Sequence, residues 1–272
     1  MKSIIKFSMA FAAVSVLVGG CKKDETPTPP SPTDPYAEFV KIAEMPILGA
    51  GVKATLYMDE DPFMGYNILY VVLKDSITNV LVEDADVTFE PVMDMGTMVH
   101  SAPWEPAIWN ADIKAFKGAA TFIMIGNWSI KIKVHNNVND HDGVGETPFT
   151  VIAKTEAQLF SFTNTADGLK YFVALVNPKS PKVGLNDFEV AVYKKQEMML
   201  FPAVDGLNIA IDPQMPSMGH GSPNNVNPAF TANGHYKGVV NFTMTGYWEV
   251  NLTIKDAANI LMYDAGFFGM TL

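Results

Sequence analysis

Apolar and polar residues alternate along several short runs of this chain. The stretches 128–134 (WSIKIKV) and 248–254 (WEVNLTI) place an apolar residue at every second position, and the shorter runs 87–89 and 207–209 do the same. Because successive side chains of a β-strand point to opposite faces, this spacing predicts strands with one buried face. No long stretch repeats its apolar residues every 3.6 positions, as an amphipathic helix would. The pattern therefore predicts an all-β protein.

Turn-forming residues separate the predicted strands at short intervals. Several short, evenly spaced strands within about 115 residues are typical of an antiparallel β-sandwich of immunoglobulin-like build. The turn signals stand at Lys74-Asp75-Ser76, Asn136-Asn137, Pro178-Lys179-Ser180 and Asn224-Asn225.

The chain contains an internal repeat with an offset of 120 residues. Segment 95–100 (MGTMVH) resembles segment 215–220 (MPSMGH), with both methionines and the histidine in register. In the same register, ten of the thirty-eight positions 95–132 are identical to their partners. Average composition would give roughly two or three identities by chance. The similarity indicates a duplication.

Upstream of this segment, the same offset superimposes apolar runs of the two copies. NILYVVLKD at 67–75 falls on DFEVAVYKK at 187–195, and segment 86–90 falls on 206–210. We therefore expect two tandem immunoglobulin-like sandwiches. The predicted domains are residues 36–153 and 154–272.

Each copy has a tryptophan at the head of its clearest alternating strand. We interpret Trp128 and Trp248 as core residues, because a large aromatic side chain can fill the space between two sheets. Gly126 and Gly246 stand two residues before them and are expected to serve a bulge or a tight bend.

The N-terminus has the layout of a signal peptide. Two lysines precede an apolar run at 7–18, which is too short to span a bilayer comfortably, and we expect the signal to cover residues 1–20. It ends in VGGC at 18–21, which resembles a bacterial lipobox, and this resemblance implies that Cys21 carries a diacylglycerol. The alternative is an ordinary secretory signal with an incidental cysteine. Cys21 is the only cysteine of the chain, so no disulfide can form within it.

The residues after Cys21 bear on location. KKDE at 22–25 resembles the short charged signal that sends some Gram-negative lipoproteins to the outer face of the outer membrane. This favours the cell surface over the periplasmic face. The proline-rich stretch TPTPPSPTDP at 26–35 favours extended polyproline II, so residues 21–35 are predicted to be an acylated linker that holds the folded part off the lipid.

The charge of the chain argues against nucleic acid as a partner. All nineteen basic residues are lysine, and removing residues 1–20 takes away two of them, so the formal charge moves from −10 to −12. The mature protein would lack the guanidinium groups used in phosphate and base recognition and would repel a polyanion. Its attachment to a lipid bilayer must then depend on the acyl chains of Cys21.

The second copy carries a candidate metal site at Met215, Met218 and His220. A thioether is a soft donor and an imidazole a borderline one, so together they favour copper, especially copper(I), over calcium or magnesium. Residues two apart on a strand share a face, so Met218 and His220 can converge, whereas Met215 joins them only if the chain bends. Pro216 and Gly219 permit such a bend. The corresponding residues of the first copy are Met95, Met98 and His100, with Met93 as a further sulfur.

A structural role is the alternative for the same residues. Methionines fill gaps where loops cap a sandwich, and a histidine can simply bond to backbone. Selective retention favours a site, because the segment 104–116 has diverged almost completely while the methionines and the histidine persist. The second copy is the better candidate, since Gly219 and Gly221 flank His220 and leave it accessible.

The second copy also resembles a known family. QMPSMGHGSP at 214–223, GHYKG at 234–238 and NFTMTGYWEVNLTI at 241–254 resemble the Met-and-His turn and the two glycine-aromatic strands of YtkA-like and FixH-like β-sandwich domains. The resemblance covers 187–255 well and 67–135 more loosely. The turn is also similar in residue type to the methionine-rich copper(I) loop of CopC-like proteins. These resemblances imply an exported, non-catalytic module of a kind sometimes associated with copper handling.

Other polar clusters are weaker candidates. The segment 135–143 (HNNVNDHDG) reads first as a solvated loop, and the acidic turn at 58–65 is interpreted in the same way. His235 could supply a second imidazole to the turn of its copy. However, Ala115 stands at the matching position of the first copy, so no site shared by both copies can require it.

Two functions remain open after this reading. An enzyme is disfavoured, because we find no zinc-protease, redox-cysteine, serine-hydrolase or phosphate-loop motif. The first function is a lipoprotein that binds or buffers copper. The second is a structural or interaction module that presents its sandwiches to a protein or glycan partner. Copper uptake by the isolated protein would discriminate between them.

Overall fold

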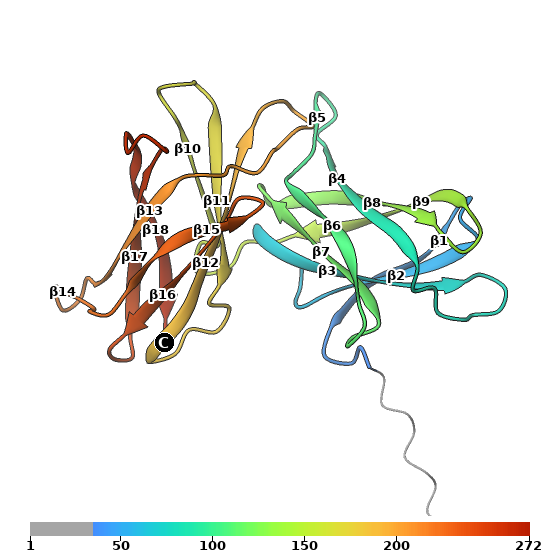
Figure 1. The fold of residues 1–272 in the computed structure, drawn as a ribbon, viewed down its shortest axis with the longest axis horizontal. Helices are drawn as coiled ribbons and strands as arrows, with labels where there is room; N and C mark the ends of the chain where they lie inside the picture. The colour runs from blue at the N-terminus through green and yellow to red at the C-terminus, as the bar shows by residue number, and fades with distance from the viewer. Residues whose placement is uncertain (1–34) are drawn as a thin grey trace, which may run out of the picture. The chain divides into compact units, whose positions relative to one another are not determined.

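The computed structural model describes residues 35–272, which form one compact unit. The predicted signal peptide, Cys21 and all but the last residue of the predicted linker lie outside the described residues. Within the described part, the regular elements are β-strands and all pairings between them are antiparallel, so the predicted all-β class is confirmed (Figure 1). No helix of residues 35–272 is both long and apolar enough to cross a bilayer.

The first sandwich contains nine strands (blue to green in Figure 1). They are connected in the order β1-β2-β3-β7-β6-β4-β8-β9, with β5 paired to β4. The strands are β1 (Val40–Ile47), β2 (Val52–Met58), β3 (Gly65–Asp75), β4 (Ala85–Asp94), β5 (Val99–His100), β6 (Trp104–Asn110), β7 (Ala115–Phe122), β8 (Gly126–Asn136) and β9 (His141–Val151).

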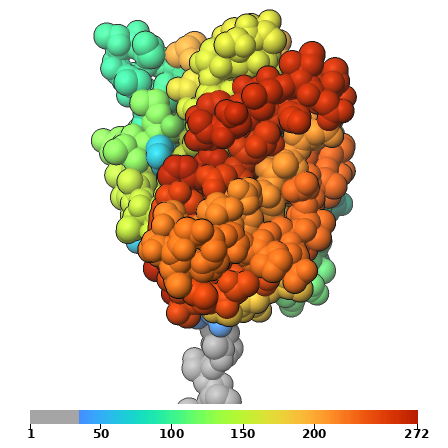
Figure 2. Space-filling model, turned by 90° about the vertical axis from the view of Figure 1, so that its left-hand side faces the viewer, coloured from blue at the N-terminus to red at the C-terminus, as the bar shows by residue number. Residues whose placement is uncertain are grey.

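The second sandwich consists of two separate sheets, with strand orders β10-β11-β12-β16-β15 and β14-β13-β17-β18. Its orange and red segments make up most of the face seen in Figure 2. The strands are β10 (Leu159–Thr163), β11 (Lys170–Asn177), β12 (Gly184–Lys195), β13 (Asn208–Met215), β14 (His220–Gly221), β15 (Val226–Ala232), β16 (His235–Phe242), β17 (Tyr247–Lys255) and β18 (Leu261–Thr271).

Each sandwich has its own core, built from the alternating faces of its strands. In β8 and β17 every second residue is buried, as the sequence pattern predicts. Trp128 and Trp248 are among the largest fully or almost fully buried side chains, which confirms their predicted place in the core. The first core runs from Met45 to Val151 and the second from Phe162 to Met270. The predicted boundary between residues 153 and 154 falls in the segment between β9 and β10.

The two sheets of the first sandwich are joined into one. Strand β6 pairs with β7 on both sides of an irregularity between Glu105 and Ile108, where it also forms a bridge to β4 through Ala107 and Val87. At the opposite edge, Leu48 and Val144 exchange backbone hydrogen bonds of 3.0 and 3.1 Å, so the segment after β1 closes against β9. The first sandwich therefore has fewer open strand edges than the second, where such edges can pair with another chain.

The strand pairing corrects the constant offset of 120 in the strands before the Met/His turn. Val71 of β3 lies opposite Phe116, whereas Val190 of β12 lies opposite Tyr236. The repeat matches Phe116 with Tyr236, which are 120 residues apart. Their strand partners, Val71 and Val190, are only 119 residues apart, so β3 corresponds to β12 with an offset of 119.

The next pair of strands has a different offset. Val87 of β4 lies opposite Val134, and Ile209 of β13 lies opposite Ile254. The repeat matches Val134 with Ile254, which are again 120 residues apart. Their partners, Val87 and Ile209, are 122 residues apart, so β4 corresponds to β13 with an offset of 122. The connection between β12 and β13 is thus three residues longer than its counterpart, and the hairpin that follows β13 is two residues shorter.

Candidate functional site

The Met/His turn forms a β-hairpin in each sandwich, and one methionine lies opposite the histidine in both. In the second sandwich Met215 of β13 is the direct cross-strand partner of His220 of β14. In the first sandwich Met93 of β4 is the direct partner of His100 of β5. Directly opposed residues of an antiparallel pair share a face of the sheet and have Cβ atoms about 5 Å apart. Each hairpin therefore brings one thioether and one imidazole together.

This pairing corrects the expectation that Met95 is the counterpart of Met215. The first hairpin is two residues longer, and Met95 stands in its turn, where its N–H donates to the Met98 carbonyl oxygen at 3.0 Å. Its side chain is exposed, whereas those of Met93 and Met215 are buried. Met93 therefore occupies the place that the uninterrupted register assigned to Met95.

A buried tryptophan lies against each of these pairs. The His100 ring meets the Trp128 ring edge-on with a centroid distance of 5.3 Å, and the His220 ring meets Trp248 in the same way at 5.8 Å. The indole N–H of each tryptophan donates to a backbone oxygen four residues earlier, at 3.0 and 3.1 Å. With its own polar group satisfied, each indole is free to act as an apolar wall beside the imidazole.

The glycines before the tryptophans make room for the methionines. Gly126 and Gly246 have φ angles of 121° and 129°. A Cβ added at Gly126 would lie 3.4 Å from Cε of Met93, and one at Gly246 would lie 3.1 Å from Cε of Met215. The predicted tight bend is therefore present, and it lets the methyl end of each thioether approach the backbone. We call the sets Met93, His100, Trp128 and Met215, His220, Trp248 the Met–His–Trp clusters.

The two histidines differ in their surroundings. His100 is 5% exposed, and its Nδ1 lies 3.0 Å from the carbonyl oxygen of Ser101. Its Nε2 is buried and has no hydrogen-bond partner among the described residues. His220 is partly exposed, and its ring contacts Trp248 without a side-chain hydrogen bond to another described residue. Each histidine thus keeps at least one ring nitrogen that the protein does not engage.

The two methionines of the second turn lie in different environments. Met215 is 2% exposed and belongs to the core, whereas Met218 is 60% exposed. The N–H groups of Met218 and Gly219 donate to the Met215 carbonyl oxygen at 3.1 and 3.0 Å, which produces the predicted bend. Met98 is exposed in the corresponding turn. The structure thus brings Met215 and His220 together and leaves Met98 and Met218 exposed in the turns.

In the described part of the chain, residues with hard donors do not form a comparable site. Within residues 35–272, no three histidine, cysteine, aspartate or glutamate side chains are arranged to hold a metal ion. His135 is bonded to Asp142 at 3.0 Å, and this hydrogen bond raises the pKa of its imidazole. In the acidic turn, Asp59 accepts a hydrogen bond from Tyr70 at 2.7 Å and pairs with Lys179, so this carboxylate is not simply solvated.

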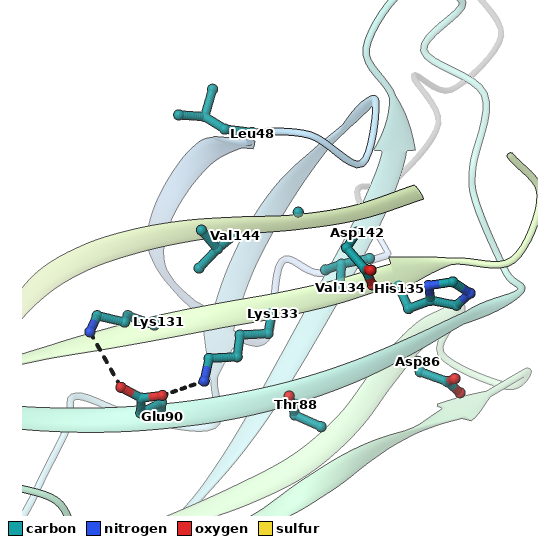
Figure 3. Close-up of a pocket in the computed structure, with 11 residues that line it drawn as sticks. Leu48, Asp86, Thr88, Glu90, Lys131, Lys133, Val134, His135, Asp142 and Val144 are labelled. Carbon is teal, nitrogen blue, oxygen red and sulfur yellow. Dashed lines mark hydrogen bonds and ion pairs between the residues drawn. The ribbon is translucent and has the colours of Figure 1, made fainter. Parts of the chain in front are cut away.

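A broad hollow of about 840 Å³ lies on the first sandwich, away from its Met–His–Trp cluster residues (Figure 3). Glu90 lies between Lys131 and Lys133 and pairs with both, the first at 3.3 Å. His135 and Asp142 pair at the other end. Because these charged side chains neutralise one another, the hollow offers no concentrated charge to a ligand.

The second Met–His–Trp cluster lies within a segment that matches a known family. The YtkA-like family model matches residues 163–253. This YtkA-like segment extends from the last residue of β10 into β17 and contains Met215, His220 and Trp248. The match confirms the resemblance of the second copy to YtkA-like domains. The first sandwich lies outside the matched residues.

Three solved structures that resemble this chain are distant from it in sequence. The adhesin InvE of Yersinia pseudotuberculosis is 14% identical with a TM-score of 0.26, and the match covers 78% of this chain and 56% of that one. Domains 5–6 of the S-layer protein SbsC are 14% identical with a TM-score of 0.29, covering 86% and 97%. The fibronectin(III)-like modules of CbhA from Clostridium thermocellum are 12% identical with a TM-score of 0.21, covering 80% and 93%.

The chain thus spans little more than half of the InvE structure. TM-scores below 0.5 do not establish a shared arrangement of the whole chain, so these similarities carry no inference about function. No curated protein matches the chain.

Proposed function

We propose that this protein is a non-catalytic, lipid-anchored lipoprotein that binds copper(I) at its Met–His–Trp clusters. The observation that carries the proposal is a duplicated pairing. In each sandwich a buried methionine lies opposite a histidine whose ring retains a nitrogen unused by the protein. Nearly all buried polar atoms have a hydrogen-bond partner, so the unpartnered Nε2 of His100 requires an explanation. An ion bound to that nitrogen supplies one.

The donor set suits a soft, singly charged ion. A thioether carries no charge, and a neutral imidazole offers one nitrogen lone pair. Soft, uncharged donors of this kind suit a copper(I) ion better than a doubly charged hard cation. Met93 with His100 and Met215 with His220 would hold the ion. Met98 and Met218, which stand exposed in the turns two residues before the histidines, would supply the thioethers that an incoming ion meets first.

The surroundings of each cluster favour the same ion. The indole of Trp128 or Trp248 covers one side of the imidazole and limits the access of water. Hard cations prefer several oxygen ligands, and the clusters contain no carboxylate. This environment would disfavour calcium and magnesium.

A competition experiment tests the proposal. Purified residues 35–272, which form a compact unit, are titrated with copper(I) against a chromophoric chelator under reducing conditions. We expect about one equivalent to be withdrawn per Met–His–Trp cluster. The double variant Met215→Leu with His220→Ala should remove one equivalent, and Met93→Leu should weaken the other.

Matched controls separate ligand loss from structural damage. Met45→Leu changes another buried core methionine, and His135→Ala changes a histidine without a methionine opposite it; both should bind copper as the wild type does. If the wild type withdraws no copper from the chelator, copper binding is refuted. The structural or interaction module with a protein or glycan partner would then be the better interpretation.

The proposed anchor is tested independently of the metal. Acylation of Cys21 would tether the sandwiches to the outer membrane, with the cell surface as the expected side. The Cys21→Ser variant should move from the membrane fraction to the soluble fraction. Protease added to intact cells should digest the wild type if it faces outward. Protection from that protease would place the protein on the periplasmic side instead.

A further inference from the structure

A second group of polar side chains is buried where the two sandwiches meet. The ring of His235, in β16, lies between two carboxylates. Its Nε2 is 2.8 Å from Oε1 of Glu105, in β6 of the first sandwich, and its Nδ1 is 2.7 Å from Oε1 of Glu189, in β12 of its own. The His235 side chain is 12% exposed. One imidazole thus connects two sandwiches through both of its nitrogens.

This geometry determines the protonation of the ring. A carboxylate oxygen accepts hydrogen bonds and cannot donate them. Both nitrogens of His235 face such an oxygen, so both must carry hydrogen and the ring must be an imidazolium. A neutral ring would direct one nitrogen lone pair at a carboxylate. The two contacts are therefore charge-assisted hydrogen bonds, which are stronger than neutral ones.

Further donors fix the carboxylate of the first sandwich. The hydroxyl of Tyr193 donates to Oε1 of Glu105 at 2.7 Å, and that of Tyr66 donates to Oε2 at 3.2 Å. Tyr193 belongs to the second sandwich and Tyr66 to the first. Burial and the nearby Glu105 charge raise the pKa of both phenols, so they remain neutral donors.

The carboxylate of the second sandwich is also satisfied. Oε2 of Glu189 accepts a hydrogen bond from the Asn177 side chain at 3.1 Å, and Lys237 Nζ lies 3.5 Å from Oε1. With Glu105 and His235 included, the group holds two negative and two positive charges. Buried charges are tolerated when they are paired and hydrogen-bonded in this way.

Apolar residues surround these side chains. A cluster of buried residues separate from the two cores includes members of both sandwiches. Such a seam limits the access of water to the ionic contacts and so strengthens them. Its members are Tyr66 and Ala119 from the first sandwich and Leu159, Phe172, Ala174, Val176, Ala191, Tyr193 and Phe201 from the second.

The duplication does not account for this contact. Ala115 occupies the position in β7 that His235 occupies in β16, because the identical Lys-Gly pairs at 117–118 and 237–238 fix the offset of these strands at 120. Glu105 lies opposite Ala119, and Val226 lies opposite Val239, so Val226 corresponds to Glu105. The first copy thus has the carboxylate of this contact and lacks the histidine, whereas the second copy has the histidine and lacks the carboxylate.

We propose that Glu105, His235 and Glu189 form an ionic pin that holds the two sandwiches as one rigid body while His235 is protonated, and that frees them to move independently when it is not. Loss of the proton removes a charge-assisted bond and leaves two carboxylates beside a neutral ring. Contacts that do not involve His235 would remain across the junction. They include the apolar seam, the Tyr193–Glu105 hydrogen bond, the bond from the Ser101 N–H to the Met198 carbonyl oxygen, and the more exposed pair of Asp59 with Lys179, which salt screens.

The surroundings of the pin set its pH range. Burial alone would lower the pKa of His235, but the hydrogen bonds and charges of Glu105 and Glu189 outweigh it and raise the pKa to about 9. Burial would raise the pKa of each glutamate, yet the His235 contacts bring both below the usual value. The pin should therefore hold from mildly acidic pH to about pH 9 and open above it.

Paired spin labels test this proposal. Cys21 is the only cysteine of the sequence and lies outside residues 35–272, so two introduced cysteines can be labelled uniquely. Ile77 and Ile260, which are 94% and 63% exposed, offer one position on each sandwich. At pH 7 we expect a narrow distance distribution between the labels, which broadens above about pH 9. In His235→Gln it should be broad at every pH, because a neutral amide cannot donate to two carboxylates with full charge.

His135→Gln is the matched control, since it removes an exposed histidine that pairs with aspartates on the first sandwich alone. It should keep the narrow distribution of the wild type. A narrow distribution in His235→Gln would overturn the proposal, because the apolar seam would then suffice. If that variant does not fold, nitrogen NMR of His235 in the wild type decides. Two ring N–H groups at pH 7 support the pin, and titration near the ordinary value of 6.5 refutes it.

Discussion

Met215 lies directly across its hairpin from His220, and the two side chains leave the same face of the sheet. The same relationship joins Met93 and His100 in the first sandwich, although the first hairpin is two residues longer. A thioether and an imidazole thus remain paired despite a change in the loop that connects them. This preserved pairing distinguishes the buried methionines from those in the turns.

Replacing Met215 should separate copper binding from stability. Met215→Leu keeps nearly the same volume and should cost less than about 1.5 kcal/mol of unfolding free energy, while copper(I) affinity at this cluster falls at least about tenfold. Met215→Ala leaves a cavity and should cost about 2–5 kcal/mol. Urea unfolding and chelator competition measure the two quantities. Equal copper affinity in Met215→Leu and the wild type would exclude the sulfur as a ligand.

Gly246→Ala should damage the second cluster more than an equivalent change elsewhere. Its φ of 129° is unfavourable for alanine, and the new Cβ would lie 3.1 Å from Cε of Met215. We expect a loss of about 1–3 kcal/mol together with weaker copper binding. Gly168→Ala is the matched control, because Gly168 also has a positive φ, of 70°, but open space for a Cβ. Copper binding in that variant should be unchanged.

Bound copper should quench the fluorescence of the tryptophans in the clusters. The chain has four tryptophans, of which Trp128 and Trp248 contact the histidines. In Trp248→Phe, the quenching on addition of copper(I) should therefore decrease by about half, whereas Trp104→Phe should leave it unchanged. Fluorescence titration of the three proteins measures this. Equal quenching in wild type and Trp248→Phe would show that the ion binds elsewhere.

The ionic pin predicts how stability varies with pH. The pKa of His235 is raised to about 9, so its stabilisation is complete below about 6.5 and disappears as pH rises to 9. The change is on the order of 3 kcal/mol. Glu105 and Glu189 have lowered pKa values, so their contribution is present above the usual carboxyl range and is lost as the medium becomes more acidic. Unfolding free energies should therefore peak at mildly acidic pH. In His235→Gln the decline above pH 6.5 should be much shallower; an unchanged slope would assign it to other groups.

The all-β class could be predicted from the sequence because strands with one buried face carry a clear alternation. Strands β8 and β17 bury every second residue, and this gives the strand, its inward face and its tryptophan together. Turn residues then separate the strands. These signals are local, so the sequence contains them without knowledge of the strand partners.

The register of the repeat could not be predicted in the same way. Strand β3 is buried on both faces, so a shift of one residue against β12 changes no visible pattern. Strand β4 alternates, but a shift of two residues preserves the alternation. The pattern of apolar residues therefore reveals neither the one-residue shift nor the two-residue shift. For this reason the constant offset of 120 points to Met95, whereas the strand pairing identifies Met93.

The ionic pin has no sequence signal at all. Glu105 and His235 are separated by 130 residues, and the segment GHYKG that contains His235 gives no indication of an acidic partner. The comparison of the copies made His235 look dispensable, because Ala115 replaces it in the first one. Only the packing of one sandwich on the other shows that the second copy needs a histidine here, because His235 bonds to Glu105 of the first sandwich.

The substitution of Glu105 by Val226 and of His235 by Ala115 also limits growth of the assembly. A third sandwich docking on the second in the same manner would meet an exposed valine where a carboxylate is needed. One docking on the first would find an alanine instead of the imidazole. The contact is thus directional: the Glu105–His235 bond joins these two sandwiches and could not be repeated with a further copy of either one.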